Sequence, residues 1–404
     1  MAENIKVYGY RWVILIAFSL LAAIIQLQWL TFAPIASAAK EFYGVSALQI
    51  DFLSIIYMLV FVVLCIPASY IIDTYGLRLG MGIGAVLTII ASLIKGFYAA
   101  DYTMVLIAQI GLSIAQPFIL NAITKVGVRW FPIAERATIA GIIMLSQYIG
   151  IIVVMIATPF MITTGTPGIY NISSMLMIYG IISAMVGVLF LIFLQEKPPT
   201  PPCLEGEDVR FEFFKGIRHI FTLRDMWYML FLFFVGMGMV NAISTCIDQI
   251  CSLKGLGIEQ SGLIGGVMLI GGIFGAIVLP TMSDIMRKRK PFLIVTMIGV
   301  LPGLIGMTIF SAFWPVLISA FIFGFFMMAA APIGIQYAAE ISAPAPESTS
   351  QGLIMFAGNI AGIIYIVGMN GLGMIPFMGL FIVLTGVNLI ITFIIKESKL
   401  IQAK

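Results

Sequence analysis

Two acidic residues, Asp73 and Asp284, stand in short charged segments of a chain that is otherwise mostly apolar. Each acid is followed five positions later by an arginine, Arg78 and Arg289, and the two acids lie 211 positions apart. A carboxylate can cap the N-terminus of a neighbouring helix and pair with a cation, and a glycine such as Gly76 permits a tight turn beside it. The spacing therefore predicts a charged latch that occurs twice.

The same offset of 211 relates GIIMLSQYIG from Gly141 to GLIMFAGNIAG from Gly352, so one half of the chain repeats the other. In the segment RWFPIAER, at 129–136, Arg129 is the expected partner of Asp73. The alternative is a loop whose charges serve only to orient the chain. The gating residues predicted on the latch reading are Asp73, Gly76, Arg78, Arg129, Glu135, Arg136, Asp284, Arg287, Arg289 and Glu340.

A second set of polar side chains lies inside apolar segments. Polar groups are costly in a membrane interior, so they usually face a cavity or form a hydrogen bond between helices. Each residue taken alone fits either reading, but their joint placement favours a substrate site near the membrane midplane. The candidate substrate-binding residues are Gln28, Trp29, Gln116, Gln147, Tyr148, Asn241, Ser244, Gln336 and Asn359, with Asn121 and Thr245 also on these segments.

Composition requires such a membrane setting. The chain of 404 residues has 61% hydrophobic and 10% charged residues and a mean hydropathy of +1.12, which excludes a water-soluble globular domain. A helix needs roughly 20 apolar residues to cross a bilayer. Spans of that kind centre near residues 25, 59, 88, 112, 148, 183, 239, 270, 300, 325, 360 and 385.

These twelve spans predict an all-α membrane protein with two pseudo-symmetric six-helix halves. The expected division is 1–195, a cytoplasmic linker at 196–225 with a short amphipathic helix at 209–221, and 226–404. The first span could also be a cleaved signal sequence, but its apolar run is too long for one, so we expect a retained helix. Eighteen Lys and Arg residues fall on the side of the termini, against Lys40, Lys95 and Lys254 opposite. Both termini should therefore be cytoplasmic, with the protein in the plasma membrane.

The twelve spans, the D-x-x-G-x-R motif after the second span and its degenerate copy after the eighth resemble the major facilitator superfamily. Within it, the first half resembles the feline leukaemia virus subgroup C receptor-related transporters, the choline, ethanolamine and haem-linked carriers. The segments that carry this likeness are QLQWLTFAPI at 26–35, FYGVSALQIDFLSIIYML at 42–59, DTYGLRLG at 73–80 and SIAQPFIL at 113–120. AISTCIDQ at 242–249 and STSQGLIMFAGNIAG at 348–362 match more loosely.

The resemblance implies a cation site in which an aromatic face attracts an ammonium group and amides orient its polar end. By position, the family's tryptophan and glutamine of helices 1 and 4 correspond to Trp29 and Gln116. This chain departs from the family at two places, with Asn241 for a tyrosine and Asn359 for a glutamine. We therefore expect a small polar or cationic metabolite, an amine resembling choline or ethanolamine, to be moved by alternating access.

Several chemistries lack their usual residues. The only histidine, His219, lies in the linker, and Cys65, Cys203, Cys246 and Cys251 show no metal-type pairing. Neither an enzyme's nucleophile–base cluster nor a phosphate-binding loop is visible, so we expect no enzymatic activity, cofactor, metal or nucleic-acid partner. Because no acid lies mid-membrane, facilitated uniport by a monomer is favoured. The alternatives are proton-coupled symport of an organic anion or other metabolite, through Asp248 or Glu340, and a receptor that does not transport.

Overall fold

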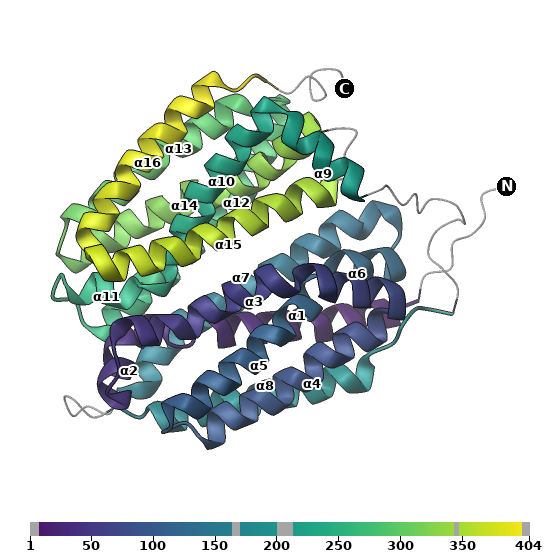
Figure 1. Cartoon of the computed structure of the whole chain (residues 1–404), viewed down its shortest axis with the longest axis vertical. Coiled ribbons are helices and arrows are strands. Elements are labelled where there is room, and N and C mark those ends of the chain that lie inside the picture. Colours follow the sequence, from purple (N-terminus) through teal and green to yellow (C-terminus); the bar gives the residue numbers. More distant parts are fainter. Residues whose placement is uncertain (1–7, 164–169, 200–212, 343–346, 398–404) are drawn as a thin grey trace. The chain divides into compact units, whose positions relative to one another are not determined.

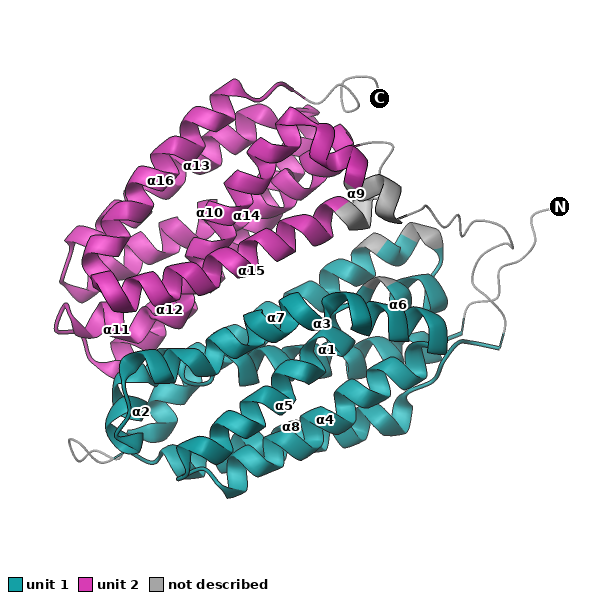
Figure 2. Cartoon of the chain, viewed as in Figure 1, with its two compact units in different colours: residues 1–209 teal, residues 210–404 magenta. Residues whose placement is uncertain are grey.

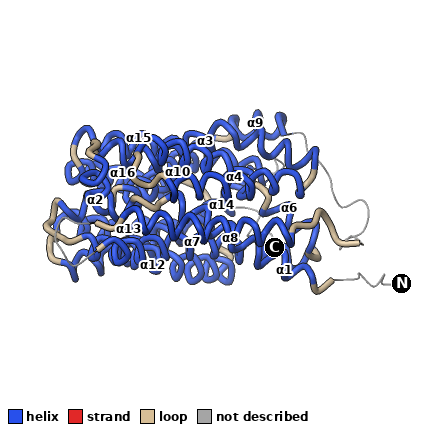
Figure 3. The backbone as a smooth tube through the Cα atoms, turned by 90° about the horizontal axis from the view of Figure 1, so that it is seen from below, coloured by secondary structure: helices blue, strands red, loops and turns tan. Residues whose placement is uncertain are grey.

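The computed structural model describes residues 8–163, 170–199, 213–342 and 347–397, and these segments are almost wholly helical (Figure 3). The chain divides into two compact units, residues 1–209 and 210–404 (Figure 2). Among the described residues, twelve helical segments are long and apolar enough to cross a membrane. The predicted all-α class and the twelve spans are confirmed.

Six of the membrane-spanning segments lie in the first unit, and the first of them is broken. Figure 1 labels their helices. In chain order the helices of this unit are α1 (Tyr10–Trp29), the 3-10 turn η1 (Ala33–Ile35), α2 (Ala36–Tyr43), α3 (Ala47–Tyr75), α4 (Leu77–Phe97), α5 (Tyr102–Leu120), α6 (Ile123–Trp130), α7 (Ile133–Ile162) and α8 (Ile172–Phe193).

The second unit begins with the short helix α9, which starts at Phe213, so positions 209–212 of the predicted amphipathic helix lie outside the described residues. Cys203 also lies outside them. The helices of this unit are α9 (Phe213–Thr222), α10 (Arg224–Thr245), α11 (Ile247–Ser252), α12 (Ile258–Met286), α13 (Lys290–Ile309), α14 (Phe313–Ser342), α15 (Glu347–Leu372) and α16 (Met374–Ile394).

The first membrane crossing is interrupted. The helix α1 ends at Trp29, and the chain continues through η1, which contains Pro34, into α2. Proline has no backbone N–H and disfavours helix in the residue before it, so the i→i−4 ladder cannot pass through this segment. The break leaves the last carbonyl groups of α1 without helical partners inside an apolar bundle, where they must be bonded in another way.

Close helix approach positions the polar side chains of each unit. In the first unit, a Cβ on Gly150 of α7 would collide with the backbone carbonyl of Ala23 in α1. In the second unit, a Cβ on Gly238 of α10 would lie 2.5 Å from the Cβ of Ala361 in α15. Small residues at helix contacts let backbones approach closely in membranes. These contacts therefore bring polar residues on α1 and α7, and on α10 and α15, into register.

Candidate functional site

Trp29 is fixed at the end of α1 by a reciprocal pair of hydrogen bonds with α3. Its indole Nε1–H donates to the backbone carbonyl of Ser54 over 3.1 Å, and the Ser54 hydroxyl donates to the carbonyl of Trp29 over 3.3 Å. A buried indole N–H normally needs such a partner. Because the polar edge of the ring is already bonded, the indole is held in one place.

An amide group lies one helical turn before Trp29. Gln26 donates from Nε2 to Oε1 of Gln147 on α7 over 3.0 Å, and Gln116 on α5 donates to Oε1 of Gln26 over 3.4 Å. Positions 26 and 29 share a helix face because residues three apart are neighbours on a helix. The structure thus joins two predicted residues, Gln116 and Gln147, through Gln26, which the sequence analysis had not selected.

Gln28 is bonded inside the first unit. Its side chain is fully buried and donates to Ser183 Oγ over 2.8 Å and to the Tyr179 carbonyl over 3.4 Å, both on α8. These bonds match the interhelical alternative, and its role as a substrate-lining residue stays a prediction. Tyr148 is half-buried beside Gln147 on α7.

The second unit holds the other predicted binding residues, on α10 and α15. Asn241 and Ser244 lie three residues apart on α10, and Asn359 on α15 donates to the Met355 carbonyl one turn earlier, over 3.0 Å. The contact between α10 and α15 joins Gly238, one turn before Asn241, to Ala361, two residues after Asn359. The asparagines of the two helices thus belong to one packed helix pair.

In the first unit, Asp73 forms its ion pair with a different residue from the one that the sequence predicted. Asp73 pairs with Lys125 on α6, with 3.2 Å between Oδ1 and Nζ, and Lys125 also donates to the Ile72 carbonyl. The predicted pair with Arg129 is therefore wrong. Lys125 lies four residues, about one helical turn, before Arg129, so the helix position decides which cation reaches the acid. The Asp73 side chain is 70% exposed, which makes this a surface ion pair.

A carboxylate that the sequence analysis missed caps α4. Glu196, just beyond α8, accepts from the backbone N–H groups of Leu77 over 3.0 Å and Arg78 over 2.6 Å. Gly76 has a φ of +101°, and a Cβ there would lie 2.8 Å from Glu196 Oε1. The glycine of the motif therefore provides both the backbone conformation and the room for the cap. The side chain of Arg78 is exposed.

Two other predicted gating residues of the first unit bind locally. Glu135 pairs with Arg11 at the start of α1, with 2.9 Å between Oε2 and Nη1. Arg136 donates to the carbonyls of Phe131 and Val128, both over 3.3 Å, at the end of α6. A cation at a helix C-terminus is favourable because the last carbonyls carry partial negative charge. These contacts tie α1, α6 and α7 together.

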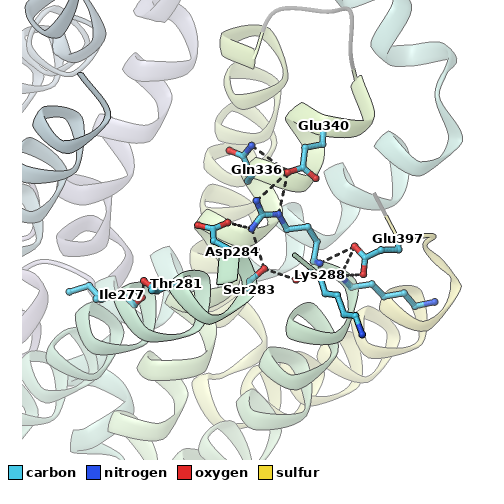
Figure 4. Close-up of polar contacts among 10 residues, drawn as sticks. Ile277, Thr281, Ser283, Asp284, Lys288, Gln336, Glu340 and Glu397 are labelled. Carbon is cyan, nitrogen blue, oxygen red and sulfur yellow. Dashed lines mark hydrogen bonds and ion pairs between the residues drawn. The ribbon is translucent and has the colours of Figure 1, made fainter. Parts of the chain in front are cut away.

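The second unit has a denser, better buried cluster around Arg289 (Figure 4). The guanidinium pairs with Asp284 and with Glu340, at 3.2 Å between Nη2 and Oε1, and donates to Ser283 Oγ over 3.1 Å. Gln336 donates to Glu340 Oε1 over 3.4 Å. Gln336 therefore adjoins this charged cluster, and its role as a substrate-binding residue stays a prediction.

The cap of α4 has a counterpart in this unit. Glu397, after α16, accepts from the backbone N–H groups of Arg289 over 2.9 Å and of Lys290 over 3.2 Å, at the start of α13. Arg287, at the C-cap of α12, adopts a left-handed conformation with φ of 52° and is exposed. Glu196 and Glu397 each follow the last helix of a six-helix set, and that recurrence is the sequence signal that could have revealed both.

Lys95 is the largest departure from expectation. The charge count placed it on an outer loop, whereas it lies on α4 with 1% exposure. Its Nζ donates to Oε1 of Gln28 over 2.8 Å, to Oγ1 of Thr31 over 3.1 Å and to Oε1 of Gln109 over 3.1 Å. Its position before the end of an apolar helix, next to Gly96, was the available signal.

Two six-helix units, each with polar side chains on its membrane-spanning helices and a carboxylate cap at one end, define an integral multi-pass membrane transporter. The chain belongs to the Major Facilitator Superfamily, whose family model matches residues 18–366. A bacterial homologue of the human lysosomal transporter Spinster, in an inward-facing conformation, has a TM-score of 0.74 over 96% of this chain and 97% of that one, at 13% identity. A D-xylose–proton symporter has the same TM-score over 97% and 99% of the chains, at 15% identity. These likenesses concern the fold.

The curated relatives agree with the resemblance inferred from the sequence. An uncharacterised transporter of this superfamily from Caenorhabditis elegans, C09D4.1, is 28% identical over 89% of this chain and 64% of that protein. The cat choline/ethanolamine transporter FLVCR1 is 30% identical over 88% and 66%. Zebrafish solute carrier family 49 member A3 is 28% identical over 92% and 80%. The chain thus spans slightly less than two thirds of the first two of these relatives.

Proposed function

We propose that this protein carries a small amine or amino alcohol across a membrane by facilitated, alternating-access transport. The observation that carries the proposal is the fixed indole of Trp29, one turn from the Gln26–Gln116–Gln147 amide group. An aromatic face attracts an ammonium ion by about 0.5–2 kcal/mol, and amides can orient a hydroxyl at its other end. A tryptophan whose N–H is already bonded has only its faces left for a ligand.

The second-unit residues point to a substrate other than choline as the preferred one. Asn241 stands where the resembled family has a tyrosine, and Asn359 stands where it has a longer amide. A site without one aromatic wall forfeits about 0.5–2 kcal/mol of cation attraction, or roughly three- to thirty-fold in affinity. Asparagine adds hydrogen-bonding capacity in its place. The proposed ligand is therefore a primary amine or amino alcohol with donors of its own.

Uniport is the proposed mode because Glu340, one of the two candidate proton carriers, is already paired with Arg289. Glu340 accepts from the buried guanidinium of Arg289 and from Gln336. We propose that transport follows the substrate gradient alone. In proteoliposomes, an imposed pH gradient should leave uptake unchanged. A several-fold stimulation by inward protons that Glu340→Gln or Asp248→Asn abolished would overturn uniport.

The cell setting is part of the same proposal. We propose that the protein is a plasma-membrane monomer with both termini in the cytoplasm, on the basis of the lysine and arginine bias. Lys95, now assigned to the helix bundle, no longer counts as an outer-loop charge, which strengthens that bias from three opposing residues to two. Cysteine labelling of tags placed at the two ends in intact cells tests the orientation.

Binding of ethanolamine and choline to the purified protein tests the substrate class. Trp29→Ala should severely impair binding and uptake, because it removes the fixed aromatic face of the first-unit group. Trp314→Ala is the matched control, since Trp314 is 69% exposed at the start of α14. If Trp29→Ala binds amines as well as the wild type does, the assignment of the site is wrong. If neither protein binds any amine while both fold, the substrate class is wrong.

A further inference from the structure

The first unit contains a lysine buried among uncharged oxygen atoms. Lys95 Nζ contacts Gln28, Thr31 and Gln109, with the Gln28 carbonyl also 3.4 Å away, and lies 5.1 Å from the ring centroid of Phe32. Among the described residues it forms no ion pair with a carboxylate. A buried cation normally has a charged partner, because removing it from water costs several kcal/mol. Lys95 therefore needs an explanation for why its partners are uncharged oxygen atoms.

The oxygen atoms around Lys95 are placed to accept hydrogen bonds from an ammonium ion. The Gln28 and Gln109 amides use their Nε2 groups to donate elsewhere, to Ser183 and to the Leu53 carbonyl, so their oxygens face the lysine. The Thr31 hydroxyl donates to backbone carbonyls of α1, which leaves its oxygen as an acceptor. With the Gln28 carbonyl, four oxygen atoms surround the three donors of –NH3⁺, whereas a neutral amine has only two donors.

This cation lies at the break of the first membrane crossing. Of the last four carbonyls of α1, those of Gln26 and Leu27 accept from Leu30 N and the Thr31 hydroxyl, and that of Trp29 accepts from Ser54. The remaining one, on Gln28, accepts from the Thr31 hydroxyl over 3.1 Å, and from Lys95 and Gln109 Nε2, both over 3.4 Å. The C-terminal end of a helix carries partial negative charge. Uncharged oxygens beside a broken helix form the kind of site at which secondary transporters hold alkali-metal ions.

We propose that the Lys95 ammonium is a built-in cation, which fills an oxygen site at the helix break and thereby positions Trp29. Two of the residues that Lys95 contacts, Gln28 and Gln109, connect it to the indole of Trp29. Lys95 holds Gln28, the residue before Trp29, and it holds Gln109, which bonds the Leu53 carbonyl beside Ser54, the partner of the indole. The proposal rests on the proposed function only in taking Trp29 as a ligand-binding residue.

The arrangement is confined to the first unit. The residue 211 positions after Lys95 is Gly306, and the residue 211 positions after Gln109 is Ala320. A Cβ on Gly306 would collide with Ser319, so that position packs two helices and has no room for a lysine. The occurrence of Lys95 beside Trp29 links it to the unit that carries the fixed indole.

The test removes the lysine and offers a free cation in its place. Lys95→Ala leaves an oxygen-lined space that n-propylammonium matches in atoms, and that Na⁺ could occupy. Purified Lys95→Ala should unfold at a lower temperature than the wild type, and n-propylammonium or Na⁺ should restore at least about half of the loss in a saturable manner. The wild type and the exposed-lysine control Lys40→Ala should respond no more than to N-methylglucamine at equal ionic strength.

A second readout reports on Trp29 itself. In protein labelled with 5-fluorotryptophan, the ¹⁹F signal that Trp29→Phe removes should shift or broaden in Lys95→Ala and return on addition of n-propylammonium. If that signal is unchanged in Lys95→Ala, or if no added cation gives a saturable response, the proposal is wrong. Should Lys95→Ala not fold, Lys95→Arg and Lys95→Met decide the matter. The charged variant should keep the wild-type signal and the neutral one should lose it, and the reverse pattern refutes the proposal.

Both readouts are independent of any substrate. If the wild type neither binds nor moves an amine while the Trp29 signal still depends on a cation at position 95, the proposed function fails and the built-in cation stands. If amines are transported but Lys95→Met transports them with unchanged KM and an unchanged Trp29 signal, the proposed function stands and the built-in cation fails.

Discussion

Arg289 offers the sharpest test of the charged clusters, through the substitution Arg289→Gln. Its side chain is 7% exposed and joins Asp284, Glu340 and Ser283 at the junction of α12, α13 and α14. Removing one partner of a buried ion pair costs about 3–5 kcal/mol, because the remaining charge stays buried without compensation. Glu340 is only 11% exposed and would be that charge.

The exposure of the two acids narrows the expected loss of stability in Arg289→Gln. Asp284 is 63% exposed and can regain water when the guanidinium is removed. We therefore expect a loss of about 2–4 kcal/mol, carried mainly by Glu340. For a unit of this size, 1 kcal/mol corresponds to about 2–4 °C, so the unfolding temperature should fall by roughly 5–15 °C. Asp73→Asn breaks a pair whose acid is 70% exposed, so it should cost about 0–1 kcal/mol.

Thermal unfolding of the purified protein in detergent measures these differences. The exposed residue Arg287 provides the matched control, Arg287→Gln, which should unfold close to the wild type. Adding Glu340→Gln to Arg289→Gln should recover part of the loss, since it removes the uncompensated carboxylate. If Arg289→Gln unfolds within about 2 °C of the wild type, or if the second substitution only adds to the loss, the reasoning from burial is refuted.

Three further predictions concern other positions. Gly76→Ala should lower the unfolding temperature more than Asp73→Asn does, because it strains a φ of +101° and displaces Glu196 from its cap; equal stabilities would contradict this. Asn241→Tyr should strengthen choline binding by roughly three- to thirty-fold, and an unchanged or weaker affinity in a binding titration would count against the aromatic-wall argument. Burial raises the pKa of the Cys251 thiol to about 12, so almost no thiolate is present at pH 8 and a maleimide should leave Cys251 unmodified until the protein is unfolded. Rapid labelling of the folded protein, absent in Cys251→Ser, would disprove the last.

The helix content and the membrane spans followed from the sequence because they are local properties. A run of roughly 20 apolar residues must satisfy its own backbone in a bilayer, and only a helix does so within one segment. The 211-residue repeat of Asp73 and Asp284 likewise needed no structure to be seen. The break after Trp29 was not predicted, because prolines such as Pro67 and Pro117 lie inside helices that continue, so Pro34 alone does not reveal it.

The partners of the charges depended on helix phase and on contacts far apart in sequence. Asp73 lies near Lys125 because α6 presents that residue, and not the one a turn later, to the end of α3. Glu196 reaches the start of α4 from 118 and 119 positions away, a separation that no local pattern encodes.

The two glutamines before Trp29 show most clearly what the sequence determined and what only the helix packing decided. The sequence determined that Gln26 and Gln28 lie in an apolar span, where each needs a partner. Residues two positions apart on a helix point about 200° away from each other, so Gln26 and Gln28 could not face the same site. Only the packing of α1 against α7 and α8 decided that Gln26 joins Gln147 beside Trp29, while Gln28 turns inward to Ser183 and Lys95. Which side of a helix meets which neighbour is a property of the bundle as a whole, because it is fixed by close contacts among all its helices at once.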